Sequence, residues 1–148
     1  MSILEQIDQD MIKALKGGDK PRLTVLRGLK SDLKYRKIEV GKDLTDELEI
    51  DVLASAAKKR RDSIEQFRAG GRDDLVQSES FELEVISSYL PKQLTEDELH
   101  QMCADAVAEV GADSPKQMGA VMKVLMPKIK GKADGKLVSK LITELLAK

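Results

Sequence analysis

The sequence predicts an all-α protein, with an N-terminal helical bundle followed by a small three-helix C-terminal domain. Three observations support this fold class. Apolar residues recur at i, i+3, i+4 and i+7 in successive segments, which is the spacing of one face of an α-helix. No window shows the strict alternation of apolar and polar residues that is typical of a half-buried strand. Glycine, proline and capping residues separate the periodic segments, as they do at helix ends.

Residues 1–92 are expected to form a unit of four helices. Ser2 stands where the first helix needs an N-cap, Pro21 opens the second helix at a position that favours proline, and Thr45 begins the third. The separators between helices are Gly17-Gly18, Gly41, Gly70-Gly71 and, at the end of the unit, Pro91. The expected helical ranges are 2–16, 21–40, 45–70 and 73–90.

Residues 93–148 are expected to form the three-helix unit, with the boundary in the segment PKQL at 91–94. Thr95 and Glu98 have the spacing of a capping box, in which each side chain bonds the other residue's backbone amide. Ser114-Pro115 begins the next helix, and Asp134 is the expected N-cap of the last one. The two apolar stripes are Met118, Val121, Met122 and Leu125, and Val138, Leu141, Ile142 and Leu145.

One ion pair can be predicted inside the first unit. Arg60 projects into the middle of the apolar arc of the third helix, and Glu82 falls among the apolar residues of the fourth. If these helices form a hairpin about Gly70-Gly71, the two charged groups lie at about the same level. We therefore predict a partly buried Arg60–Glu82 pair with a structural role, because losing one partner would leave an unpaired charge.

Composition limits the class of protein. The chain has 148 residues, of which 41% are hydrophobic and 34% charged, and its net charge is −1. No apolar run approaches the roughly 18 residues of a membrane span, and no signal-peptide pattern follows Met1. Cys103 is the single cysteine, so no intramolecular disulfide can form and a reducing compartment is expected. We expect a cytoplasmic location and no membrane partner.

The sequence offers little for catalysis. His100 is the single histidine and lies in the first turn of a helix, where a surface role is expected. Cys103 lies on an apolar helical face without a histidine at a suggestive spacing, so a small core residue is the better interpretation. Neither GGDKPR nor AGGRDD has the spacing of a nucleotide-binding loop. We expect no catalytic residue, no metal site and no cofactor.

Charge is segregated along the chain. Residues 1–70 carry a net charge of +2, residues 71–113 a net charge of −9, and residues 114–148 a net charge of +6. The last segment holds eight lysines against Asp134 and Glu144. The candidate RNA-binding lysines are Lys123, Lys128, Lys130, Lys132, Lys136 and Lys140. Lys128, Lys130 and Lys132 are expected in the loop PKIKGKADGK at 127–136, which joins the helices of the two apolar stripes. Gly131 and Gly135 would let a phosphate approach the backbone closely, and Lys132 and Lys136 crowd the N-terminal end of the last helix.

Two basic regions of the chain, the C-terminal lysines and a run of four cations at 58–61, each have an alternative interpretation. The C-terminal lysines could instead be a basic segment that covers the acidic middle of the chain. The run Lys58-Lys59-Arg60-Arg61 sweeps around its helix, so it cannot form a single patch. It is either a solvated face or part of a secondary basic surface. That surface would consist of Lys58, Arg61, Arg68 and Arg72.

Three segments resemble the YqeY family, whose members are related to the tail of the B subunit of tRNA-dependent amidotransferases (GatB). They are KKRRDSIEQFRAGGRDDL at 58–75, E-x-x-E-L-E-V-I-x-x-YLPKQL at 79–94, and MGAVMKVLMPKIKGKADGK at 118–136. The last is the most specific of the three. The resemblance implies an N-terminal helical domain and a small helical C-terminal domain similar to the GatB tail. The family-pattern positions are Gly119, Lys123, Lys130, Gly131, Lys132, Asp134 and Gly135, with the lysines as phosphate contacts.

The resemblance also implies a function class. The amidotransferase tail helps to hold tRNA by its body while chemistry occurs in another domain. The family label often carries a description as a carbon–nitrogen ligase with glutamine as amido-N-donor. This chain shows none of the machinery for that reaction, so we interpret the label as association and not as activity.

The first hypothesis is therefore a non-catalytic RNA-binding module, with tRNA or another structured RNA as partner and an aminoacylation or amidotransferase complex as context. About five phosphate contacts would make log affinity fall with log salt at a slope of about −3.5 to −4.5. One alternative is a protein-interaction adaptor, in which the methionines Met118, Met122 and Met126 and the acidic middle of the chain dock a partner. Binding of that kind would survive nuclease and high salt. The other alternative is an accessory subunit of a glutamine-dependent ligase, which would need a partner that carries the active site.

Overall fold

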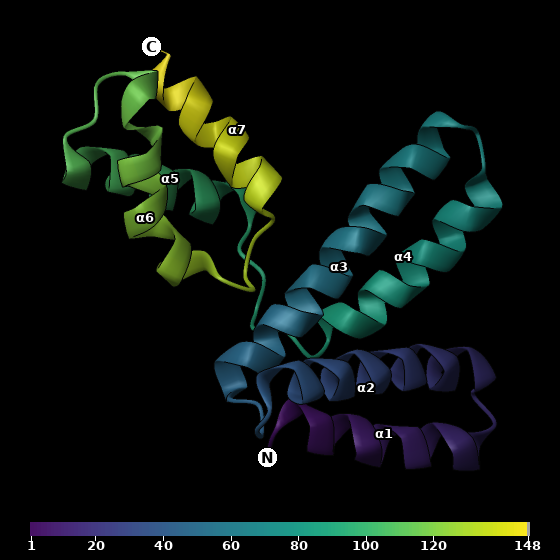
Figure 1. The fold of residues 1–148 in the computed structure, drawn as a ribbon. Coiled ribbons are helices and arrows are strands. Elements are labelled where there is room, and N and C mark those ends of the chain that lie inside the picture. Colours follow the sequence, from purple (N-terminus) through teal and green to yellow (C-terminus); the bar gives the residue numbers. More distant parts are fainter. Residues whose placement is uncertain (148) are drawn as a thin grey trace. The chain divides into compact units, whose positions relative to one another are not determined.

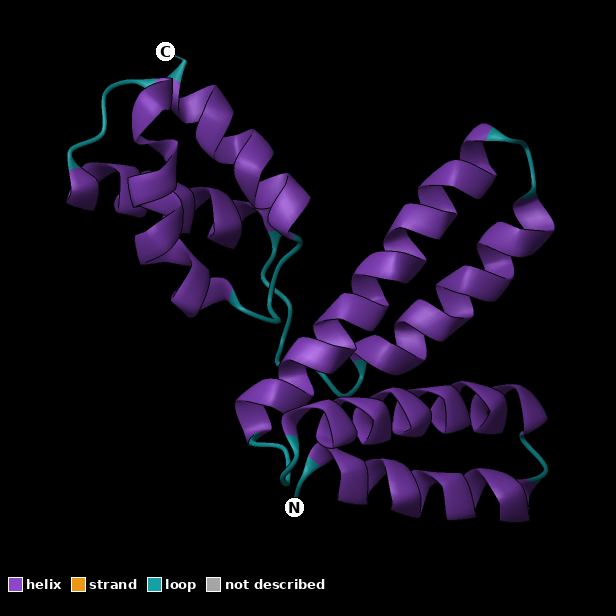
Figure 2. Cartoon of the chain, viewed as in Figure 1, coloured by secondary structure: helices purple, strands orange, loops and turns teal. Residues whose placement is uncertain are grey.

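The computed structural model describes residues 1–147, and it confirms the all-α fold class (Figures 1 and 2). Those residues form seven α-helices and one short 3₁₀ helix, with no strand among them. The elements are α1 (Ile3–Gly17), α2 (Lys20–Val40), α3 (Asp46–Ala69), α4 (Asp73–Ser87), α5 (Glu96–Val110), η1 (Pro115–Gln117), α6 (Met118–Ile129) and α7 (Gly135–Leu146).

The chain divides into two compact units, Met1–Pro91 and Lys92–Lys148, which we call the N-terminal and C-terminal units. Each unit has an apolar core of its own. Lys148, the last of the eight lysines in residues 114–148, lies outside the described residues. Within residues 1–147, no helix combines the length and the apolar character needed to cross a lipid bilayer.

The N-terminal unit consists of two helical hairpins, α1–α2 and α3–α4, with α2 packed on both α3 and α4 (Figure 1). α2 begins one residue before the expected proline, because Asp19 caps it by accepting a hydrogen bond from the Arg22 amide. Gly41 ends α2 at φ 78°, a conformation that glycine adopts without strain. The core of the unit includes Ile7, Leu26 and Leu53, which are fully buried.

α4 ends earlier than the sequence indicates. It stops at Ser87, three residues before the expected end at Leu90. The chain instead closes in tight turns, in which the Tyr89 amide donates to the Ile86 carbonyl. The Tyr89 hydroxyl donates to Asp10 of α1. This contact between the end of α4 and α1 takes the place of a further helical turn.

Glu49 links α3 to the start of α1. Its side chain is the one charged group among the described residues that is fully buried, at 3% exposure. Its two carboxylate oxygens accept hydrogen bonds from the backbone amides of Ile3, at 3.3 Å, and Leu4, at 3.0 Å. The next two amides of α1 bond the hydroxyl and the carbonyl of Ser2. The amides of Ile3, Leu4 and Glu5, which have no partner within the helix, are thus all satisfied, two of them by another helix.

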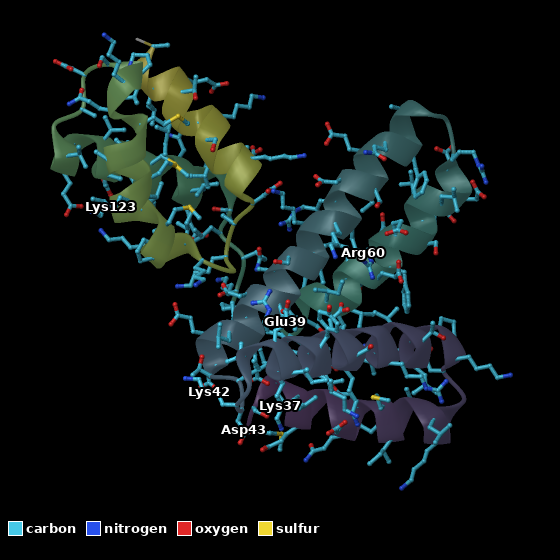
Figure 3. All side chains as sticks on the ribbon, in the orientation of Figure 1. Lys37, Glu39, Lys42, Asp43, Arg60 and Lys123 are labelled. Carbon is cyan, nitrogen blue, oxygen red and sulfur yellow. The ribbon has the colours of Figure 1, made fainter. Side chains whose placement is uncertain are left out.

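Arg60 lies between α3 and α4 (Figure 3), where its Nε is 3.2 Å from Glu82 Oε2. This is the ion pair that the registers of the two helices predict. Glu79, one turn earlier on α4, lies 3.6 Å from the same nitrogen. The three side chains are about one quarter exposed. Burial, and after it the neighbouring Glu82, raises the pKa of Glu79.

The C-terminal unit packs α5, α6 and α7 around a core that includes Leu99, Leu125 and Ile142. The predicted capping box is present at the start of α5, where the Thr95 hydroxyl accepts from the Glu98 amide at 3.1 Å. The segment after Ser114 forms a 3₁₀ turn before α6 begins at Met118, so the predicted cap is one turn away from that helix.

Candidate nucleic-acid interface

The six candidate lysines are all exposed, and they come from α6, α7 and the loop 130–134 between them. Lys123 and Lys128 lie on α6, Lys130 and Lys132 in the loop, and Lys136 and Lys140 on α7. The expectation that Lys128 belongs to the loop is wrong. α6 continues past Pro127 to Ile129, because Ile129 is 1% exposed and its burial in the core outweighs the helix-breaking tendency of the proline.

The loop is held in place by the segment that enters the C-terminal unit. The Gln93 side-chain amide donates to the Gly131 carbonyl at 2.7 Å, and the Leu94 backbone amide donates to the Lys132 carbonyl at 2.9 Å. The Lys132 amide donates to the Ile129 carbonyl at 2.8 Å. A lysine loop that is ordered before binding loses less conformational entropy when it meets a ligand.

The glycines of the site differ in whether the local backbone conformation requires a glycine. Gly131 has φ 74°, so a residue with a side chain would be strained there. A Cβ atom added at Gly119 or at Gly135 would meet no atom within 4 Å. The sites of Gly119 and Gly135 are therefore open to solvent or to an approaching phosphate, and packing does not explain them.

Asp134 caps α7, as predicted, through a 3.2 Å hydrogen bond from the Lys136 amide to Asp134 Oδ1. The Asp134 carboxylate therefore accepts from one of the backbone amides to which an anion at the helix N-terminus would bind. Lys136 and Lys140 are spaced i, i+4 and lie on the face of α7 opposite its buried Val138 and Ile142. Asp134 thus takes up part of the helix N-terminus, and the side chains of Lys136 and Lys140 lie on the exposed face of α7.

The lysines do not form one uniform surface. Lys128 Nζ lies 3.5 Å from Glu109 Oε2 of α5, and because both side chains are more than half exposed, the pair is weak. Lys140 borders a hollow of about 240 Å³ between α5 and α7, and Glu96 and Asp97 border it too. Lys123 extends from α6 on the side away from α7 (Figure 3). Lys130, Lys132 and Lys136 follow one another closely, in the loop and at the start of α7, and the other three lysines lie further along α6 and α7.

The secondary basic surface lies in the N-terminal unit and is less available. Lys58, Arg68 and Arg72 are exposed, whereas Arg61 is half-buried. Arg72 is engaged by Asp74, with Nη2 3.2 Å from Oδ2. Lys58 and Arg68 remain as the exposed cations of α3 on this surface.

The two residues considered for catalysis lie in α5. His100 is exposed, and Cys103 is fully buried in the core of the C-terminal unit. Burial raises the pKa of the Cys103 thiol, so the reactive thiolate is disfavoured. Within residues 1–147, no cluster of histidine, cysteine or carboxylate side chains has a geometry that would hold a metal ion.

Sequence reasoning missed the residues that shape the site. Gln93 positions the lysine loop from 38 residues away, and Glu109 partly neutralises Lys128. A glutamine in a linker and a glutamate on a helix carry no local signal for these roles. They follow only from the way α5 and the entering segment pack against α6 and the loop.

These features define a class: a small all-α protein whose C-terminal helical unit presents an ordered lysine loop. The family model described as "Yqey-like protein" matches residues 4–146. The chain therefore belongs to the YqeY family.

Curated relatives carry the name "Altered inheritance of mitochondria protein 41, mitochondrial". One from Lachancea thermotolerans is 39% identical over 85 residues, covering 57% of this chain and 46% of the relative. One from Pyrenophora tritici-repentis is 28% identical over 147 residues, covering 97% of this chain and 81% of the relative. One from Saccharomyces cerevisiae is 30% identical over 128 residues, covering 86% of this chain and 68% of the relative. The chain thus spans less than half the length of the Lachancea relative.

Proposed function

We propose that the C-terminal unit binds the phosphate backbone of a structured RNA, with tRNA as the first candidate, and that it does so without catalysing a reaction. The observation that carries the proposal is the ordered loop 130–134, with exposed Lys130 and Lys132, followed directly by Lys136 on α7. Lysines around a loop that is already tied down are suited to phosphate contacts. The similarity of segment 118–136 to the amidotransferase tail supports the same interpretation.

Recognition would be of backbone and shape. Residues 92–148 contain no phenylalanine, tyrosine or tryptophan, so no aromatic side chain of this unit is available to stack on an unpaired base. Lys130, Lys132 and Lys136 are the central contacts, and two of the surrounding lysines bring the number to about five. Such a module would serve an aminoacylation or amidotransferase complex by holding the RNA while a partner performs the chemistry.

The adaptor alternative gains no specific support from the C-terminal unit. Met118 and Met122 pack against its core, and only Met126 of the three methionines on α6 is exposed, at 40%. As for location, a cytoplasmic site remains a prediction. The relatives are named as mitochondrial proteins, and the proposal needs only a compartment that holds structured RNA.

The test is tRNA binding by fluorescence anisotropy across a salt series. The wild-type slope of log affinity against log salt should be about −3.5 to −4.5. A Lys130→Ala/Lys132→Ala/Lys136→Ala variant should bind more weakly and have a slope of about −1.5, because about two contacts remain. Circular dichroism of the variant should show that it is folded.

The matched control removes three exposed lysines of the N-terminal unit, with the substitutions Lys13→Ala, Lys34→Ala and Lys42→Ala. This control changes the net charge equally, so it should keep the wild-type slope. Absence of binding at low salt, or equal slopes for the two triple variants, would rule out the loop as an RNA site.

A further inference from the structure

The outer side of the α1–α2 hairpin carries a hollow of about 330 Å³ that is apolar on one side. Ile12 and Leu15 of α1 border it, and they are 54% and 65% exposed. Met11 of α1 and the buried Leu23 of α2 line it as well, and both are less exposed than Ile12 and Leu15. We call this hollow the α1–α2 groove. Large apolar side chains that stay exposed side by side in a groove are typical of an interaction site.

The other side of the α1–α2 groove is basic. Lys20, Arg27, Lys30 and Lys34 are spaced along one face of α2 at helical intervals, and Arg27 and Lys30 border the groove directly. Lys30 pairs with Asp8 of α1 at 2.5 Å, and this pair neutralises the one acidic residue that borders the groove. Within residues 1–147, Lys20, Arg27 and Lys34 form no ion pair. The groove therefore combines apolar contact area with positive charge that has no counterion in the protein.

We propose that the α1–α2 groove docks an amphipathic helix of a partner protein whose apolar stripe is flanked by aspartate or glutamate. The apolar residues of that helix would cover Ile12 and Leu15, and its carboxylates would face Arg27 and the lysines of α2. A helix laid along the groove would make a three-helix arrangement with α1 and α2, in which its apolar face is buried at an ordinary helix-packing distance.

The same features argue against two other occupants. RNA would gain nothing from Ile12 and Leu15, because aliphatic side chains do not stack on bases as aromatic rings do. An anionic membrane surface would cover Ile12 and Leu15 but would leave the hollow beside them unfilled, whereas the side chains of a docked helix can fill it. This docking site lies in the N-terminal unit and does not depend on the RNA proposal, so either can fail alone.

The experiment places a photo-cross-linking residue, p-benzoylphenylalanine, at position 12 of the full-length chain in the cells that make it. The cross-linked species is identified by mass spectrometry. The expected adduct is a protein segment with apolar residues at i, i+3 and i+4 and an excess of acidic residues. The same residue at position 38, which is exposed at 78% on α2 but does not border the groove, is the control and should not capture that segment.

A synthetic peptide of the captured segment is then titrated against the purified chain. Leu15→Ser should weaken binding about tenfold, because it removes an apolar contact without changing the core. Arg27→Glu should weaken it by a similar factor and reduce its salt dependence. Lys13→Glu, on the opposite face of α1, is the matched control and should bind like the wild type.

Four results would overturn the proposal. They are adducts with RNA or lipid at position 12, cross-links only to another copy of this chain, no adduct at all, and a peptide whose affinity is unchanged by Leu15→Ser. Since both Leu15 and Arg27 are exposed, neither substitution should unfold the chain, and circular dichroism checks this.

Discussion

Replacing Glu49 with alanine should lower the free energy of unfolding of the N-terminal unit by about 3 kcal/mol. The Glu49 carboxylate accepts two hydrogen bonds, from the amides of Ile3 and Leu4, at the start of α1. A hydrogen bond to a charged group contributes about 1.5 kcal/mol or more, and its loss leaves a donor without a partner. Glu49→Gln keeps one acceptor oxygen, so we expect about half the effect.

The assay is urea unfolding followed by tyrosine fluorescence. Both tyrosines, Tyr35 and Tyr89, belong to the N-terminal unit and the chain has no tryptophan, so the signal reports that unit alone. The control is Asp46→Asn, which removes an exposed charge from the first turn of α3 and should cost less than about 1 kcal/mol. If Glu49→Ala cost no more than this control, the carboxylate would not be stabilising the start of α1.

Three further predictions concern titratable groups. Burial, with the hydrogen bond to Asp10, raises the pKa of Tyr89 above its ordinary value of 10.0. Its stabilising contribution is therefore present below about pH 10 and is lost above it. Urea unfolding followed by circular dichroism should show this loss, and Tyr89→Phe should reduce it. Burial also raises the pKa of Glu79, so the ionised carboxylate costs stability above about pH 4.5. Glu79→Gln should therefore raise the free energy of unfolding at pH 7 by less than about 1 kcal/mol. It should also flatten the pH dependence of that free energy between about pH 4 and 6. An unchanged pH profile in either variant would count against that assignment. The buried Cys103 thiol should react with a thiol reagent more than about 100-fold slower in the native chain than in denaturant, and fast native labelling would contradict its burial.

The sequence predicts the parts of this protein that depend on neighbours along the chain. The cap at Thr95 bonds a residue three positions away, and Asp134 bonds one two positions away. A short-range hydrogen bond of this kind forms whenever the helix does, so residue type and spacing are enough to predict it. The Arg60–Glu82 contact belongs to the same class, since a short turn at Gly70-Gly71 sets the register of the two helices.

Local signals were misleading where burial opposed them. Pro127 marks a helix end by its chemistry, yet α6 continues through it, because ending the helix there would leave Ile129 out of the core. α4 stops before Leu90 although the periodicity continues, and Tyr89 contacts Asp10 of α1 instead. In both cases contacts between helices outweighed the preference of a short segment.

The sequence by itself determined the all-α class, most helix ends and the number of lysines in the C-terminal segment. Only the tertiary structure decided what those lysines can do: it pairs Lys128 with Glu109, places Lys140 beside Glu96 and Asp97, and ties the loop at Gly131 to Gln93. The reason is physical. Helix formation depends on contacts within a few residues, whereas charge neutralisation and loop order depend on groups that packing brings together from distant parts of the chain.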